Sequence, residues 1–321
     1  MPPSSSLGNP FNDQKRNPDT PAFFETVLGK KGTGRRRKSP PVEDFGAETD
    51  FVLSAEDQKR IEDERIFSEI ITRESRALRK FFGKEIVVHP LPKQATAERI
   101  LEWRRLGLEL HYLPSISMAE IKRDADGIIT DVEPKKFPGW KEKPGEGTPD
   151  RKYDIDFFDE VKSGDFDPSA VSLPGAWILV DSHEKPHFDN QYVNDPLAPA
   201  LEGLRKEKII ADFKIKGSRF NLSLIELKDP KVLEAFAKAL NLHTIPGLAI
   251  DIPRVIEFNI LGNIHYRQWD RSQTAVWLSD THRSQVLYGG SSFYGGLSHV
   301  GLGDLTHRGR NLGFLVIGRF S

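Results

Sequence analysis

The stretch VLYGGSSFYGGLSHVGLGDLTHRGRNLGFLVIGRFS, residues 286–321, carries the strongest signals for a fold. It combines paired glycines and scattered aromatic residues with a run, LGFLVI at residues 312–317, that is apolar on both faces. A strand that is apolar on both faces is typical of the interior of a sheet. The Gly289–Gly290 pair follows a short strand, where glycine permits the positive φ of a tight reversal. This stretch is therefore predicted to supply a central strand.

The segments before this stretch mix short helices and short strands. AWILVDS, residues 176–182, is predicted to be a buried strand, and residues 195–210 a short helix. Residues 228–242 are predicted to be a second helix, with Asp229 as N-cap and Pro230 in its first turn. Because helices and strands do not alternate regularly, the pattern favours an α+β class over a parallel βαβ sheet.

The N-terminal half is predicted to be helical and irregular. Ser54 and Gly83 are placed to cap a long amphipathic helix between them. A short strand is expected at residues 84–92 and a second helix at residues 96–110. The Pro/Gly-rich run at residues 134–149 marks a boundary. We therefore expect a disordered basic, proline-rich tail at residues 1–53, a helical and irregular region at residues 54–150, and an α+β domain at residues 151–321.

Four short segments of the C-terminal half occur in an order that resembles the formylglycine-generating-enzyme/sulfatase-modifying-factor family. Ile252-Pro253 and Glu257-Phe258 stand where the family has a Leu-Pro and a Glu-Trp pair. A tryptophan-to-Ser-Asp segment, AVWLSD at residues 275–280, follows these pairs. Gly289-Gly290-Ser291 and Gly313-Phe314 match a family turn and a terminal strand, although Leu315 replaces the family's arginine. The resemblance covers about the last hundred residues and implies a C-type-lectin-like fold there.

Composition excludes several kinds of chemistry. The chain of 321 residues has no cysteine, which rules out disulfides, thiolate nucleophiles and cysteine zinc sites. It also excludes formylglycine-generating activity, since that activity depends on active-site cysteines in the family that the chain resembles. The formal net charge is −1, so no overall field favours nucleic acid or a membrane surface.

The sequence also indicates where the protein is located and which partners it has. The first residues lack the apolar core of a signal peptide, and no stretch has the roughly 20 apolar residues that span a bilayer. We therefore expect a cytoplasmic protein without a membrane partner. The basic run KKGTGRRRK at residues 30–38 could be a nucleic-acid or partner-docking patch, but it has no aromatic residues between its charges for stacking on bases, which favours a solvated linker.

One candidate metal site lies in DSHEKPHFD, residues 181–189. His183, His187 and Asp189 offer two imidazoles and a carboxylate, which suit zinc or ferrous iron. Pro186 opposes a helix through this stretch. The alternative is a polar loop after the AWILVD strand, with histidines that are hydrogen-bonded or solvated.

A second candidate site is a surface formed by the C-terminal loops. Loops on a rigid scaffold often carry recognition, and tyrosine and arginine contribute strongly to interfaces. The candidate ligand-binding residues are Trp277, Asp280, His282, Arg283, Tyr294, His299, His307, Arg308 and Arg310. In relatives with the C-type-lectin-like fold this region displays the binding surface.

Two functions follow from these sites. The first is a non-catalytic protein that binds a protein or small-molecule partner through the C-terminal loops and needs no cofactor. The alternative is a mononuclear iron or zinc enzyme that uses His183, His187 and Asp189.

Overall fold

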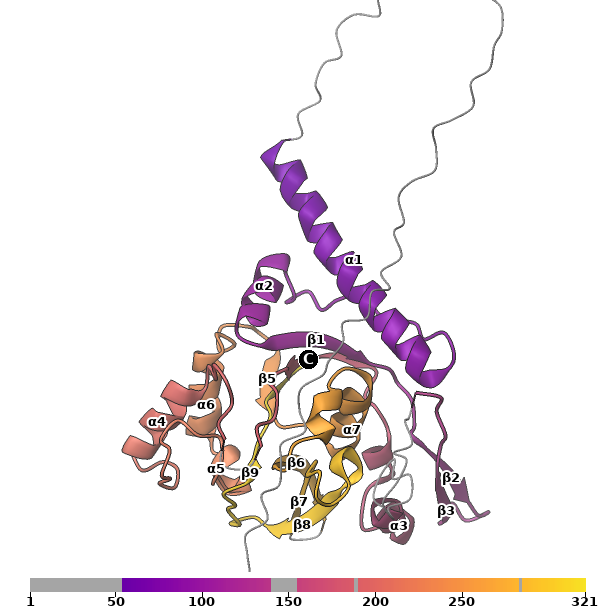
Figure 1. Ribbon diagram of the computed structural model, residues 1–321. Coiled ribbons are helices and arrows are strands. Elements are labelled where there is room, and N and C mark those ends of the chain that lie inside the picture. Colours follow the sequence, from indigo (N-terminus) through magenta and orange to yellow (C-terminus); the bar gives the residue numbers. More distant parts are fainter. Residues whose placement is uncertain (1–53, 140–154, 188–189, 283–284) are drawn as a thin grey trace, which may run out of the picture. The chain divides into compact units, whose positions relative to one another are not determined.

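The computed structural model describes residues 54–139, 155–187, 190–282 and 285–321, and Leu53–Ser321 form one compact unit. Within these residues the chain has seven α-helices and three β-sheets, which confirms the α+β class (Figure 1). The helices are α1 (Ala55–Phe82), α2 (Ala97–Arg105), α3 (Ile155–Ser163), α4 (Ala198–Lys206), α5 (Leu224–Leu227), α6 (Pro230–Ala239) and α7 (Val255–Ile264). None of the described helices has the length and apolarity to cross a bilayer.

The main sheet is antiparallel throughout and has the strand order β1-β4-β10-β5. Its strands are β1 (Leu108–Leu113), β4 (Ala176–Asp181), β5 (Leu248–Asp251) and β10 (Ile317–Phe320). The C-terminal strand β10 therefore lies inside the sheet, but it contains only the last residue, Ile317, of the run predicted to be a central strand. The predicted strand is divided, however, because the first part of the apolar run, β9 (Leu312–Gly313), pairs in a different sheet.

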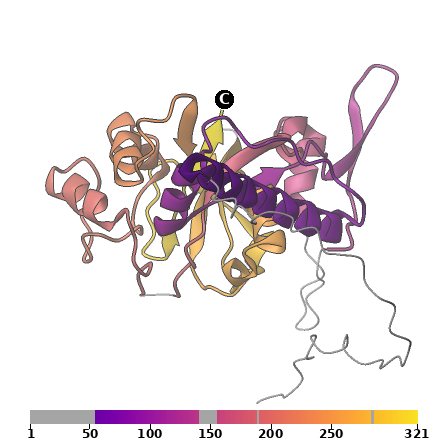
Figure 2. The same ribbon diagram turned by 90° about the horizontal axis from the view of Figure 1, so that it is seen from above.

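The second four-stranded sheet has the order β8-β7-β6-β9. It contains β6 (Ala275–His282), β7 (Gln285–Gly289) and β8 (Val300–Asp304), and β9 joins it parallel to β6. A two-stranded hairpin, β2 (Ala119–Arg123) and β3 (Ile129–Pro134), extends away from the main sheet, and α4 and α6 lie at the opposite end (Figure 2). Three single-turn 3₁₀ helices complete the described elements, at Pro168–Val171, Arg267–Asp270 and Gly296–Ser298.

Helix α1 begins and ends at the residues that its sequence predicted. The Ser54 side chain accepts a hydrogen bond from the backbone N–H of Asp57, and Gly83 ends the helix with φ of 71°. The helix crosses β1 (Figure 1) and buries one stripe of side chains against the body. The stripe is Ile66, Ile70, Glu74, Leu78, Phe81 and Phe82, at helical spacing. Glu74 is the only charged side chain in this buried stripe, so it needs polar partners inside the fold.

Helix α7 is buried over most of its length, from Val255 to Gly262. It ends at the C-cap His265, whose backbone N–H donates to the Leu261 carbonyl. The chain then continues through Tyr266 into the 3₁₀ helix Arg267–Asp270. The end of α7 consequently carries His265 and Tyr266 to the side of β1 that α1 covers, where both approach His111.

Two predicted elements differ from the structure. Residues 84–92 form no strand, since Pro90 and Pro92 have no N–H to donate to a ladder. The helix predicted for residues 96–110 ends at Arg105, because Gly107 adopts φ of 71° and β1 begins at Leu108. The boundary expected at residue 150 falls outside the described residues, and β1 before it pairs with β4 after it.

Candidate metal centre

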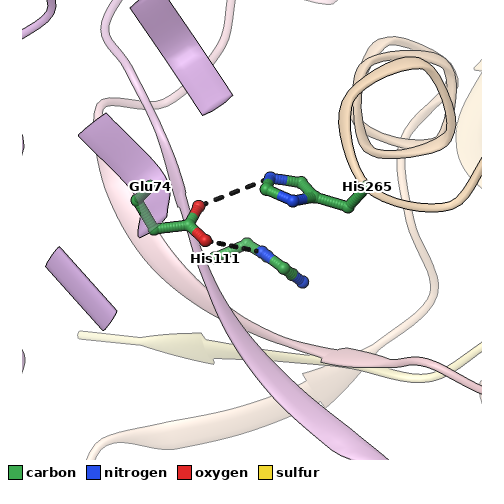
Figure 3. A group of neighbouring side chains, drawn as sticks. All are labelled: Glu74, His111 and His265. Atoms are coloured by element: carbon green, nitrogen blue, oxygen red, sulfur yellow. Dashed lines mark hydrogen bonds and ion pairs between the residues drawn. The ribbon is translucent and has the colours of Figure 1, made fainter. Parts of the chain in front are cut away.

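Three metal-ligating side chains converge from three separate elements (Figure 3). Glu74 comes from the middle of α1, His111 from β1, and His265 from the residue that follows α7. The Glu74 Oε1 atom lies 3.1 Å from Nδ1 of His111, and Glu74 Oε2 lies 3.4 Å from Nε2 of His265. One ligand atom from each of the three residues lies within 4.8 Å of the other two.

The three side chains are largely removed from solvent. Glu74 and His111 are buried, and the side chain of His265 keeps 11% of its surface exposed. The two imidazole rings lie nearly face to face, with centroids 3.9 Å apart and planes inclined by 31°. One carboxylate therefore lies opposite two imidazole nitrogens in a dry environment, where each interaction is strong.

Backbone and arginine contacts fix the orientation of the Glu74 carboxylate. The Nε of Arg73 donates to Oε1 at 3.0 Å, and the backbone N–H of Tyr112 donates to Oε2 at 3.1 Å. Arg73 also reaches the Leu110 carbonyl at 2.6 Å and Glu109 at 3.2 Å. The carboxylate is thus held in place by groups other than the two histidines, as second-layer partners hold ligands in metal sites.

The charge states suit metal ligation. Burial, reinforced by the neighbouring His265, lowers the pKa of His111 to about 3, so this imidazole is neutral at pH 7. Burial opposes the charge of Glu74, but the interactions with His111 and His265 outweigh burial and hold the pKa of Glu74 below its usual range. A neutral imidazole and an ionised carboxylate are the forms that bind metal ions.

Tyr266 contacts the other nitrogen of His111. The Tyr266 hydroxyl lies 2.6 Å from His111 Nε2, and burial raises the pKa of Tyr266 well above its usual value. The Tyr266 ring stacks on Trp269 with centroids 4.4 Å apart, which fixes the hydroxyl. With Nδ1 bound to a metal, Nε2 would carry the proton and donate to Tyr266; without metal, Nδ1–H donates to Glu74 and Nε2 accepts from the Tyr266 hydroxyl.

The histidines singled out from the sequence lie elsewhere. His183 Nδ1 is 2.6 Å from Asp181 Oδ1, and Arg219 contacts the other oxygen of Asp181. His187 is exposed, and Asp189 lies outside the described residues. In the described part of the chain, neither His183 nor His187 belongs to a group of three metal-ligating side chains.

The C-terminal loop residues have several different environments. Trp277 is fully buried and donates from Nε1 to the Leu222 carbonyl at 2.8 Å. Asp280 accepts a hydrogen bond from the first backbone N–H of α7. Tyr294 is 65% exposed and lies 5.0 Å from the His299 ring. His307, Arg308 and Arg310 are exposed, His282 belongs to β6, and Arg283 lies outside the described residues.

Sequence reasoning missed all three residues of this cluster, although each carried a signal. Glu74 interrupts an apolar helical stripe, and His111 interrupts the apolar strand LELHYL. His265 directly follows the apolar helix α7. A polar residue inside an apolar pattern indicates a buried polar group, which must find a partner.

Comparisons with models of protein families, with curated proteins and with solved structures find no match for this chain.

Proposed function

We propose that this protein binds one divalent transition-metal ion through Glu74, His111 and His265 and uses it as a mononuclear metal centre. The observation that carries the proposal is the convergence of three ligand atoms within 4.8 Å of one another. The three residues come from α1, β1 and the end of α7, so only the folded chain brings them together. Such convergence makes metal binding and the stability of this part of the fold interdependent.

The ligand set favours zinc or ferrous iron. Two imidazoles and one carboxylate are the ligands of many catalytic zinc sites and of non-haem iron sites with open positions. Structural zinc sites usually have four protein ligands, whereas catalytic sites have three and leave a position for water or substrate. A site of three ligands therefore fits an enzyme better than a structural metal site.

A hydrogen-bonded polar cluster without metal is the competing explanation. Every nitrogen that faces Glu74 can donate to it when both histidines are neutral, so the network is also satisfied without an ion. The two explanations differ in metal content and in which ring nitrogen of His111 carries the proton, and both differences are measurable.

Elemental analysis of the purified full-length protein by mass spectrometry tests the proposal. We expect about one zinc or iron per chain, and loss of this metal in His265→Ala. His243→Ala, at an exposed histidine, is the matched control and should keep the metal. Because changes at the buried His111 or Glu74 can unfold the chain, the second measurement uses the unaltered protein. After the bound metal has been removed by a chelator, added cobalt(II) should show the absorption bands of a cobalt ion in a low-symmetry site. It should also raise the melting temperature of the protein.

Two results would overturn the proposal. The first is a protein that is fully folded without metal and whose melting temperature does not change with added zinc, iron(II) or cobalt(II). The second is stoichiometric metal that stays bound in His265→Ala. Either result would leave the cluster as a structural polar network.

A second candidate function is the display of a recognition surface by a C-type-lectin-like C-terminal domain. Its support is a set of exposed apolar side chains in one C-terminal segment: Phe293, Tyr294, Leu302 and Leu305 are 66%, 65%, 46% and 40% exposed. Exposed aromatic residues are common in protein interfaces. Tyr294→Ala should abolish capture of a partner without lowering the melting temperature, and unchanged capture would contradict this candidate.

A further inference from the structure

A groove of about 900 Å³ lies along α1, and the end of α7 forms part of its wall. The groove is next to the candidate metal centre, because Arg73 lines the groove and also donates to Glu74. Asn263, Ile264 and Arg267 line it beside His265. A volume of this size matches sites that take small organic ligands.

The wall of the groove is strongly basic. Arg65, Arg73, Arg76 and Lys80 follow one face of α1, and Arg267 adds a fifth cation. Among the described residues that line the groove, Glu69 is the one with a carboxylate, and it lies 3.6 Å from Arg104. The groove consequently carries an excess of positive charge, although the chain as a whole has a formal net charge of −1.

Three of these cations have no ionic partner among the described residues. Arg65 pairs with Glu62, and Arg73 is occupied by Glu74 and Glu109. Among the residues that the structure describes, no carboxylate forms an ion pair with Arg76, Lys80 or Arg267. Like charges four residues apart on a helix, such as Arg76 and Lys80, destabilise it. A bound anion would remove that repulsion.

The groove also offers apolar surface. Ala77 and Phe81 of α1 and Ile264 of α7 line it together with the cations. An apolar wall beside several cations fits a ligand with a strongly charged end and an apolar body. Three unpaired cations suit a group with more than one negative charge, and a phosphate carries about −1.5 to −2 at pH 7. The planar fork of arginine matches the oxygens of a phosphate.

We propose that the groove between α1 and the end of α7 binds a small phosphate-bearing molecule with an apolar portion, with Arg76, Lys80 and Arg267 holding the phosphate. The proposal stands without a metal ion, because its contacts come from the groove alone. Should both sites function together, Arg73 would link them, because it lines the groove and donates to Glu74.

A second groove in the same chain provides the control. It has a volume of about 810 Å³ and is lined by Lys206 and Lys208, among other residues. There Arg308 pairs with Glu226 and Lys216 pairs with Asp212, so its charge is largely neutralised. Lys206→Gln with Lys208→Gln removes two positive charges, as does Arg76→Gln with Arg267→Gln. The two double variants therefore have equal net charge and differ only in the groove that is altered.

The test is calorimetric titration of the full-length protein with pyrophosphate, with ATP and with a short single-stranded oligonucleotide, before and after chelation of metal. We expect saturable binding of ATP that survives chelation. The Arg76→Gln/Arg267→Gln variant should weaken it about tenfold or more, since hydrogen bonds between charged groups are strong. The Lys206→Gln/Lys208→Gln variant should change it less than about twofold.

Several outcomes would overturn the proposal. They are no saturable binding of pyrophosphate or ATP at millimolar concentration, equal weakening by both double variants, and binding of the oligonucleotide alone. The last outcome would indicate a nucleic-acid surface. Metal content distinguishes failure of the anion proposal from failure of the metal-centre proposal. The Arg76→Gln/Arg267→Gln variant alters no metal ligand, so it should keep the ion that His265→Ala loses.

Discussion

Arg319 of the interior strand β10 forms a bidentate ion pair with Glu257 of α7, with nitrogen-to-oxygen distances of 2.6 and 2.8 Å. The Glu257 side chain is fully buried, and its Oε2 also accepts the backbone N–H of Arg254 at 2.9 Å. This pair joins the main sheet to the helix that carries His265. Through α7, the position of the candidate metal ligand depends on the C-terminal strand.

Removal of Arg319 should destabilise the fold strongly. Arg319→Ala leaves the Glu257 carboxylate buried without its cation, which costs about 3 kcal/mol of unfolding free energy in comparable buried pairs. Urea denaturation measures this loss. Lys238→Ala is the control, because the Lys238–Glu234 pair is about 60% exposed on both sides and should contribute less than about 0.5 kcal/mol. Equal effects of the two changes would contradict the importance of the buried pair.

Lys185 should make stability rise with pH. Its ammonium is buried, donates to the carbonyls of Thr274 and Gly290, and faces the Phe258 ring. Burial lowers the pKa of Lys185 to about 7, against the opposing charge of Asp270. In the unfolded chain the pKa is about 10.4. Between these two values the unfolded state binds more protons, so the free energy of unfolding increases as pH rises from 7 to 10.

The comparison for this effect is Lys185→Met. Below pH 7 the folded and unfolded states of the unaltered protein both carry the Lys185 proton, so the pH dependence from Lys185 is confined to the window above 7. Urea denaturation at several pH values gives the free energy of unfolding as a function of pH. Its slope should be steeper for the unaltered protein than for Lys185→Met, by up to about 1.4 kcal/mol per pH unit. Parallel slopes for the two proteins would show that Lys185 does not titrate in this window.

A side chain at Gly107 should destabilise the fold, for two separable reasons. It has φ of 71°, and an added Cβ would overlap the imidazole of His183, which Asp181 holds in place. Gly127 has φ of 82° but open space around it, so Gly127→Ala has only the backbone strain. We expect Gly127→Ala to lose about 1 kcal/mol and Gly107→Ala to lose roughly 2 kcal/mol more. Similar losses in thermal and urea unfolding would mean that His183 moves aside freely.

Asp280 should act on stability and not on ligand binding. Its carboxylate accepts the backbone N–H of Val255 at 2.5 Å and pairs with Arg254 at 3.4 Å, so it caps α7 from a neighbouring strand. Asp280→Ala should lower the free energy of unfolding by about 1–3 kcal/mol. Asp304→Ala, at an exposed position in β8, should change it by less than about 0.5 kcal/mol. An Asp280→Ala protein of unchanged stability would return this residue to the candidate recognition surface.

Local signals in the sequence predicted the elements that depend on local interactions. The caps of α1 at Ser54 and Gly83, the N-cap of α6 at Asp229 and the apolar strand β4 all lie where the sequence placed them. The prediction for residues 96–110 extended too far, because helical periodicity outweighed the signal of Gly107. Of the apolar run at residues 312–317, only Ile317 belongs to the interior strand β10, while Leu312–Gly313 form the edge strand β9 of the second sheet; this division depends on distant partners.

The candidate metal centre was not predictable by the same means. The cluster DSHEKPHFD is close in sequence, and that proximity favoured His183 and His187. Glu74, His111 and His265 are distant in sequence and meet only because α1 crosses β1 and α7 ends beside both. Each could have been recognised as a buried polar residue, but which of them meet is decided by tertiary packing.

Strand β10 can take its place between β4 and β5 only after the ribosome has made roughly 135 residues beyond β4. At usual elongation rates this interval lasts roughly 7 to 27 seconds. Throughout it, β4 can pair with β1 on one edge, while its other edge has no native partner yet. An unpaired apolar strand edge promotes association between nascent chains. We therefore expect newly made chains to depend on chaperones until β10 has been synthesised.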